Sequence, residues 1–165
     1  MPPRSRDAGF TMIEVMVTIV LLSIMMTIAV GSYWRWARAN EQSGTARTLQ
    51  TVLRHSQQRA VTEGRSVCVE FNTAANTYTV YRASTPTLPA CSDPAKVSVR
   101  GPVKTAGKSV RLATATFVSP AGAVAKVSFT PHGSAWAGEV TVSRDGSSKV
   151  YTLTVEGLTG RVSIA

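Results

Sequence analysis

The stretch Gly9-Phe10-Thr11-Met12-Ile13-Glu14 opens the apolar segment around which the whole chain is organised. This segment runs from Phe10 to Val30, and Glu14 is the one residue in it that can carry a charge. At ~1.5 Å rise per residue, a helix of that length reaches ~30 Å, which is the thickness of the hydrocarbon core of a bilayer. The sequence therefore predicts a membrane-spanning helix. A carboxylate inside such a helix costs ~2.5–3.5 kcal/mol and marks a functional site.

A cleaved secretory signal is the alternative interpretation of this apolar N-terminus, and the basic residues Arg4 and Arg6 ahead of it suit both. The apolar part of a secretory signal usually has roughly 7–15 residues, whereas this segment is longer and contains Glu14 near its start. Small residues at 29–32 keep the signal peptide open as a second choice. We favour the membrane anchor, because length and charge both fit it better.

The helical pattern continues beyond the apolar segment, because no proline occurs between Pro3 and Pro86. An unbroken helix from Thr11 to Glu63 is ~80 Å long. In its second half, residues 31–63, apolar side chains recur at helical spacing on one face: Ala46, Leu49, Val52, Leu53, Ala60 and Val61. The opposite face is polar: Arg47, Gln50, Arg54, Gln57 and Gln58. We expect the apolar face to pack on the rest of the chain and the polar face to meet water.

From residue 64 to the C-terminus the hydrophobic period changes to two, which is typical of β-strands. The clearest pair is a hairpin of residues 67–71 and 78–80, and residues 83–96 form an irregular loop with three prolines. Further strands are expected at 97–100, 110–112, 114–118, 124–130, 139–143, 150–155 and 160–164. The predicted fold class is α+β, with the long N-terminal helix laid against an antiparallel sheet.

Composition limits which functions the 165-residue chain can have. Its formal charge of +9 favours attraction to polyanions or acidic partners. The two histidines, His55 and His132, have no partner nearby in sequence that would make a catalytic base, and no catalytic or nucleotide-binding motif is present. Neither cysteine has a second ligand at metal-binding spacing. We therefore expect no enzyme activity, no cofactor and no metal site.

Cys68 and Cys91 fall on a predicted strand and in a predicted loop. If the domain lies outside the cytoplasm, an oxidising compartment favours a disulfide between them, worth roughly 3 kcal/mol. The alternative is two unrelated thiols, with Cys68 a small buried residue.

The opening residues resemble the class III signal of type IV pilins and type II secretion pseudopilins, in which Gly and Phe precede a short apolar stretch and a Glu. The resemblance implies that prepilin peptidase cuts between Gly9 and Phe10 and methylates the new N-terminus of Phe10. It also implies a cytoplasmic leader (residues 1–9), a single-pass helix in the inner membrane (10–30) and a β-rich domain (64–165) outside the cytoplasm. We further expect Glu14 to pair with the Phe10 amine of a neighbouring subunit, because both charges are costly when unpaired in apolar surroundings.

Later motifs are similar to those of the H-type pseudopilins and of the FimT and FimU minor pilins: Arg59-Ala60-Val61, Phe129-Thr130-Pro131-His132-Gly133 and Gly157-Leu158-Thr159-Gly160-Arg161-Val162. The resemblance implies a pilin-like structural subunit of a secretion pseudopilus or type IV pilus, built with other subunits. A DNA-binding minor pilin of the FimT kind is the alternative, with Arg161 as the DNA contact. Ser163 stands where a second basic residue is expected, so we favour an ordinary solvated basic surface.

Overall fold

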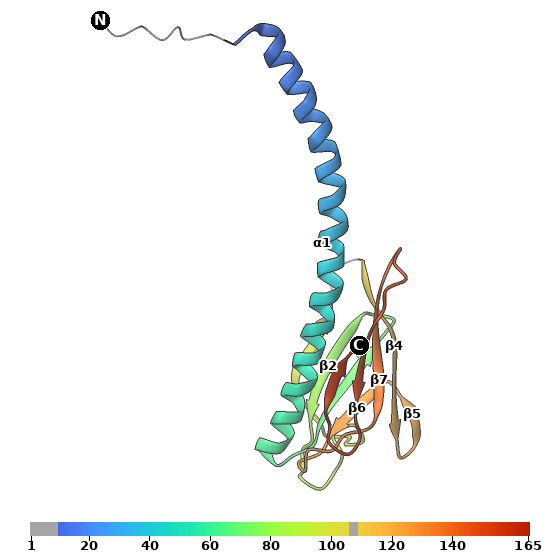
Figure 1. Cartoon of the computed structure of the whole chain (residues 1–165). Coiled ribbons are helices and arrows are strands. Elements are labelled where there is room, and N and C mark those ends of the chain that lie inside the picture. The colour runs from blue at the N-terminus through green and yellow to red at the C-terminus, as the bar shows by residue number, and fades with distance from the viewer. Residues whose placement is uncertain (1–9, 106–108) are drawn as a thin grey trace, which may run out of the picture. The chain divides into compact units, whose positions relative to one another are not determined.

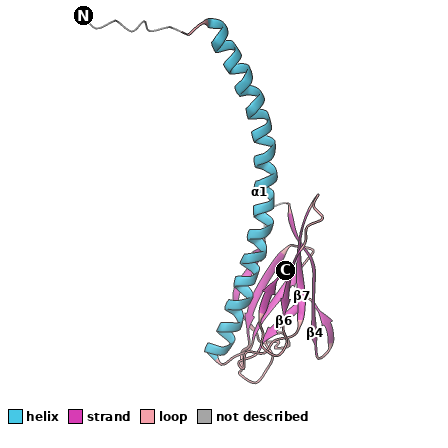
Figure 2. Cartoon of the chain, viewed as in Figure 1, coloured by secondary structure: helices cyan, strands magenta, loops and turns pink. Residues whose placement is uncertain are grey.

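The structure, a computed structural model, describes residues 10–105 and 109–165. In this part of the chain one long helix, α1 (Met12–Glu63), precedes the strands (Figures 1 and 2). The strands follow in the order β1 (Val67–Asn72), β2 (Thr77–Arg82), β3 (Val97–Lys104), β4 (Val110–Ser119), β5 (Gly122–Val124), β6 (Lys126–Phe129), β7 (Gly138–Arg144), β8 (Tyr151–Val155) and β9 (Val162–Ile164). Two compact units divide the chain, Met1–Arg38 and Ala39–Ala165, and α1 contributes to both.

In the first unit, the described residues are the start of α1 and its apolar segment. This segment is long and apolar enough to cross a membrane, and none of it is buried within the chain. Three hydroxyl groups along it, those of Thr18, Ser23 and Thr27, donate to backbone carbonyls one turn earlier at 2.8, 2.8 and 2.9 Å. The hydroxyls are thus satisfied within the helix, and they present no unpaired donor to lipid.

The second unit contains two antiparallel sheets, with strand orders β3-β2-β1-β6 and β5-β4-β7-β8-β9. Both sheets and the helical residues 39–63 share one hydrophobic core. The helix contributes Ala46, Leu49 and Leu53, each at most 1% exposed. Phe71 of β1 and Phe117 of β4 stack with ring centroids 5.8 Å apart, and so join the two sheets. Because all of this core lies within residues 39–165, this unit has what it needs to fold by itself.

The predicted α+β class, the unbroken helix and the first hairpin are confirmed. The single strand expected at 124–130 is wrong, because the chain changes sheet there: β5 pairs with β4, and β6 pairs with β1. The strands expected at 110–112 and 114–118 form one strand, β4, with an irregularity between Leu112 and Thr114. A period of two identifies extended chain, but it does not say which sheet receives it.

The polar face of the helix does not simply meet water, as the sequence led us to expect. Gln50 Nε2 and Arg54 Nη2 donate to the Val162 carbonyl at 3.4 and 3.0 Å. Gln57 Nε2 donates to the carbonyls of Gly133 and Thr159 at 3.0 and 2.8 Å. These side chains therefore bind the C-terminal segment to the helix and cover the exposed edge of β9. Val61, assigned to the apolar face, is 51% exposed.

Candidate functional site

The start of α1 is built by Thr11, the residue that precedes the helix. The Glu14 backbone N–H donates to Thr11 Oγ1 at 3.3 Å and to the Thr11 carbonyl at 3.1 Å. Thr11 is therefore the N-cap, and it satisfies a backbone donor that the helix leaves free. The Glu14 carboxylate lies in the first turn, where the helix dipole stabilises negative charge. Sequence reasoning missed the role of Thr11, although the spacing Thr-x-x-Glu is that of a capping box.

The surroundings of Glu14 are apolar and exposed. Phe10 and Ile13 are 81% and 71% exposed, and among the described residues no group forms an ion pair or hydrogen bond with the Glu14 carboxylate. Farther along, Ile13, Met16, Val17, Val20 and Leu21 form a shallow, wholly apolar surface at helical spacing. Gly9, the other half of the expected cleavage site, lies outside the described residues. This helix end therefore presents one acid beside an apolar stripe.

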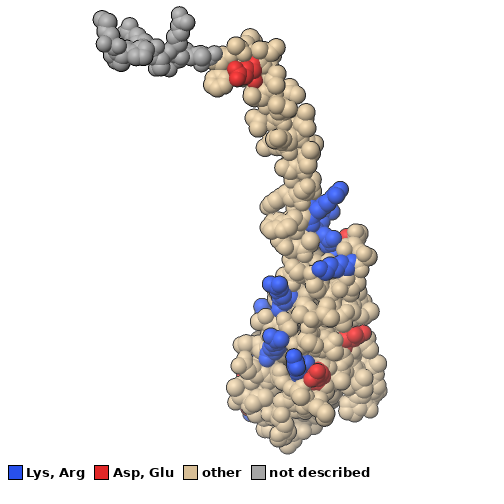
Figure 3. All heavy atoms as spheres, viewed as in Figure 1, with Lys and Arg blue, Asp and Glu red and all other residues tan. Residues whose placement is uncertain are grey.

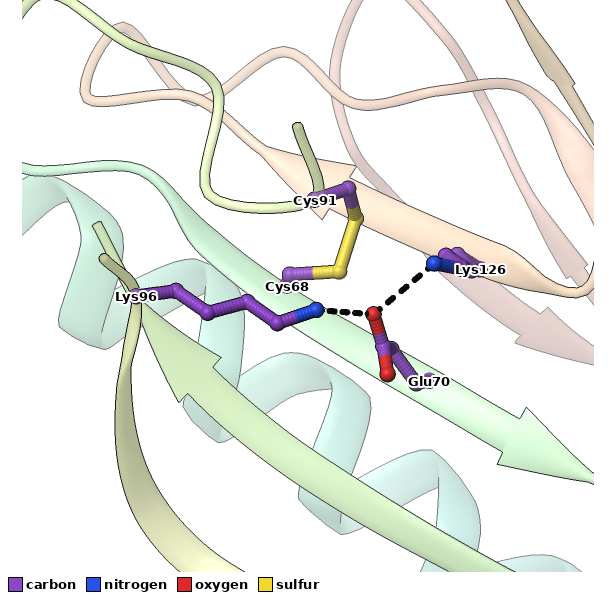
Figure 4. Close-up of a disulfide and its surroundings, with 5 residues drawn as sticks. All are labelled: Cys68, Glu70, Cys91, Lys96 and Lys126. Atoms are coloured by element: carbon purple, nitrogen blue, oxygen red, sulfur yellow. Dashed lines mark hydrogen bonds and ion pairs between the residues drawn. A yellow bond between two sulfur atoms is a disulfide. The ribbon is translucent and has the colours of Figure 1, made fainter. Parts of the chain in front are cut away.

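On the β domain, a disulfide joins Cys68 of β1 to Cys91 and ties the loop of residues 83–96 to the sheet (Figure 4). Cys68 is fully buried, with Ala83 and Ala90 packed around the bond. Asp93 fixes the same loop, because its carboxylate accepts the hydroxyl and the backbone N–H of Ser84 at 2.6 and 2.7 Å. These hydrogen bonds, the hydroxyl first, hold the pKa of Asp93 below its ordinary value.

Glu70 lies beside the disulfide and forms ion pairs with the ammonium groups of Lys96 and Lys126, the latter at 3.0 Å (Figure 4). Partial burial acts to raise the pKa of Glu70, but the two lysines outweigh it and the pKa is lowered. Lys96 also lies over the Tyr81 ring, 4.3 Å from its centroid. Through Lys96, the ion pairs of Glu70 hold the end of the loop of residues 83–96 against the sheet. This structural feature was not predicted from the sequence.

Other residues singled out from the sequence lie apart from this cluster. Arg161 is exposed just before β9, and His55 and His132 are exposed as well. Within the described ranges, no group of three His, Cys, Asp or Glu residues could hold a metal ion. Four basic residues in or next to the sheets are in ion pairs: Arg82 with Glu63 at 3.1 Å, Arg111 with Asp145 at 3.0 Å, and Lys96 and Lys126 with Glu70. The visible face still shows more basic than acidic groups (Figure 3).

Comparison with models of protein families shows which family the chain belongs to. The family model described as Type II transport protein GspH matches residues 45–159, which is most of the chain. The chain belongs to the GspH family. A second model, the prokaryotic N-terminal methylation motif, matches residues 4–30 and so covers the start of α1. GspH-family proteins are structural pseudopilin or pilin subunits rather than enzymes, and they assemble with other pilin-like subunits in a filament.

Solved structures share the fold of this GspH-family chain at low sequence identity. The minor pseudopilin EpsH of Vibrio cholerae is 11% identical with a TM-score of 0.57, over 76% of this chain and 96% of EpsH. The minor pilin FimU of Pseudomonas aeruginosa is 12% identical with a TM-score of 0.54, over 79% and 92%. The Escherichia coli GspH is 15% identical with a TM-score of 0.52, over 78% and 88%. A comparison with curated protein sequences finds no match.

The GspH-family match explains why the N-terminal motif and the β domain occur in one chain. The methylation-motif match spans the apolar segment and Glu14, whereas the GspH match begins at residue 45, within the amphipathic half of the helix. The apolar half of α1 marks a membrane-anchored subunit. The predicted family, fold class and structural role are confirmed.

Proposed function

We propose that the chain is a minor pseudopilin or minor pilin that is processed between Gly9 and Phe10 by prepilin peptidase. Residues 1–9 are then the cytoplasmic leader, and residues 10–30 are the single pass through the inner membrane. Residues 31–63 form the amphipathic half of the helix, and the β domain of 64–165 lies outside the cytoplasm. The observation that carries this proposal is the Glu14 carboxylate at the capped start of an exposed apolar helix, where residues 10–105 and 109–165 offer it no ion-pair partner.

The proposed assembly step follows from the cost of unpaired charge. Cleavage frees an α-amine on Phe10, with an ordinary pKa of ~7.7–8.0 that leaves it largely protonated at neutral pH, and peptidase methylation keeps it basic. In the membrane this ammonium and the Glu14 carboxylate are both costly unless each finds an opposite charge. Neighbouring subunits in the filament supply both opposite charges. The Glu14 carboxylate of one subunit pairs with the Phe10 amine of the next subunit, and this pairing fixes the axial register between their helices.

The location of the β domain is supported by the Cys68–Cys91 bond. Disulfides persist in oxidising compartments such as the periplasm and are rare in the cytoplasm. A domain held in place by this bond therefore fits the outer side of the cytoplasmic membrane. The helix then remains in the bilayer until the subunit is extracted into a filament.

The test replaces Glu14 by valine in the full-length chain, produced together with its filament subunits. We expect membrane insertion and cleavage to persist, while incorporation into the filament fraction falls at least tenfold. Thr18→Val is the matched control, because it also removes a polar group from the same helix but leaves the charge, and it is expected to assemble normally. Equal incorporation of the Glu14→Val variant and the unmodified chain would contradict the charge-pair mechanism. The N-terminal residue and its methyl group are read from the intact mass.

A further inference from the structure

A groove of about 430 Å³ lies between the helical residues 51–59 and strands β2 and β3. Its floor is apolar: Val52 and Val80 are 9% and 5% exposed, and Val99 is half-buried against the same core. This volume is within the range of roughly 300–1,000 Å³ that is typical of binding pockets. The groove therefore has room for several side chains of another molecule.

The rim of this groove is basic. His55 and Arg59 lie on the helix, and Arg100 lies on β3. Arg59 and Arg82 share the carboxylate of Glu63, whereas among the described residues no carboxylate pairs with Arg100. Of the two arginines that line the groove, Arg59 is paired with Glu63, whereas the Arg100 guanidinium lies over the Tyr78 ring, 5.9 Å from its centroid. A surplus of positive charge beside an apolar floor favours an occupant that is apolar and acidic.

The backbone of β3 limits how such an occupant binds. β3 is an edge strand, but its pairing with β2 shifts register on both sides of Val80, and Pro102 has no N–H to donate. Bulges and proline protect an edge against the addition of another strand. The occupant is therefore held through side chains that enter the groove, and not by extension of the sheet.

A second copy of this chain is a poor occupant. Six of its nine Asp and Glu side chains are already engaged. Glu63, Glu70 and Asp145 are in ion pairs, and Glu41, Asp93 and Glu156 accept hydrogen bonds from side-chain hydroxyl groups. Two copies of this basic chain also repel one another. The charge has to come from a different protein.

We propose that this groove is the docking site for an acidic segment of a different, neighbouring filament subunit. The segment places an apolar side chain over the valine floor and carboxylates against Arg59 and Arg100. This inference rests on the proposed function, because it takes the neighbour to be a member of the same filament.

The test uses the full-length chain in cells that also produce the other filament subunits. A photo-cross-linking amino acid replaces Thr51, which lines the groove, and the captured peptide is identified by mass spectrometry. We expect a peptide with Asp or Glu residues from another filament subunit. Arg100→Glu is expected to lower the yield about tenfold, which corresponds to about 1.4 kcal/mol. Arg47→Glu makes the same charge change on an exposed part of the helix outside the groove, and it should leave the yield unchanged.

A second variant, His55→Glu, changes the rim from the helix side and is expected to lower the yield as well. Equal thermal unfolding of all variants shows that these exposed substitutions leave the fold intact. Restored cross-linking when an acidic residue of the captured segment is changed to lysine in the Arg100→Glu background would support the proposal strongly.

Three results would overturn the inference: capture of a second copy of this chain, capture of a segment without carboxylates, or an unchanged yield with Arg100→Glu. Filament incorporation is measured in the same cells, and it separates the two hypotheses. A chain that enters the filament without a groove cross-link overturns the docking site alone. A chain that is absent from the filament overturns the proposed function, and the docking site with it.

Discussion

Replacing Gly160 by alanine is expected to destabilise the β domain far more than the same change at another glycine with positive φ. Gly160 has φ of 61°, and a Cβ there would contact the Gly133 carbonyl oxygen and lie 2.6 Å from Gln57 Nε2. Gly146 has φ of 73°, but a Cβ there would meet nothing within 4 Å. Both alanine variants therefore have the energetic cost of a positive φ, but only the Cβ at position 160 also collides with neighbouring atoms.

The magnitude follows from these contacts. An L-residue with positive φ costs about 1–2 kcal/mol, which is the whole effect expected for Gly146→Ala. At Gly160 the new methyl group also displaces Gln57, which loses hydrogen bonds to two carbonyls. At about 0.5–1.5 kcal/mol for each bond, this adds about 1–3 kcal/mol. We thus expect Gly160→Ala to lower the free energy of unfolding by at least ~2–5 kcal/mol, because the Gly133 carbonyl must also shift to make room for the Cβ.

The assay is urea unfolding of residues 39–165, followed by fluorescence. Trp136 is the one tryptophan in this fragment, because Trp34 and Trp36 precede it, and it packs against the core. Combining Gly160→Ala with Gln57→Ala should cost less than the sum of the two single changes, since the second removes the group that is displaced. Equal losses for the two glycine variants, or strict additivity with Gln57→Ala, would refute the reasoning.

Three further predictions concern the disulfide, the ion pairs of Glu70 and the basic surface. Replacing both cysteines by serine is expected to cost about 3.4 kcal/mol, from the loop entropy for a sequence separation of 23 residues; an unchanged urea midpoint would contradict it. The folded chain holds the pKa of Glu70 below its ordinary value of 4.5. The Glu70 ion pairs therefore add their full contribution to the free energy of unfolding above pH 4.5, and this contribution is lost as the pH falls through the lowered pKa. Glu70→Gln should therefore flatten the pH dependence of unfolding on the acid side of pH 4.5, and an unaltered slope would count against the ion pairs. In gel shifts at about 0.15 M salt we expect residues 39–165 not to retain DNA, because four lysine and arginine residues in or next to the sheets are already ion-paired. Retention that Arg161→Ala abolishes would instead support the DNA-binding alternative.

The apolar segment, the helix that continues from it and the alternation of the first hairpin can all be predicted from the sequence. These features depend on neighbours along the chain, because helical and strand periods are repeated within a few residues. The N-terminal motif, with Gly9, Phe10 and Glu14, is equally local, and it was enough to indicate the family before any contact was known. The capping role of Thr11 was within reach of the same reasoning, since the cap and its partner are three residues apart.

The division of the β domain into two sheets, and the contacts that close it, depend on tertiary packing. Residues 124–130 belong to two sheets, and nothing in their alternation marks the change. Cys68 and Cys91 form a disulfide because the loop between them folds back over β1. The same loop brings Lys96 to Glu70, with which it forms an ion pair. Gln57 reaches carbonyls that are 76 and 102 residues away in sequence. Such partners depend on which segments pack side by side, and a pattern of polar and apolar residues leaves that choice to the folded chain.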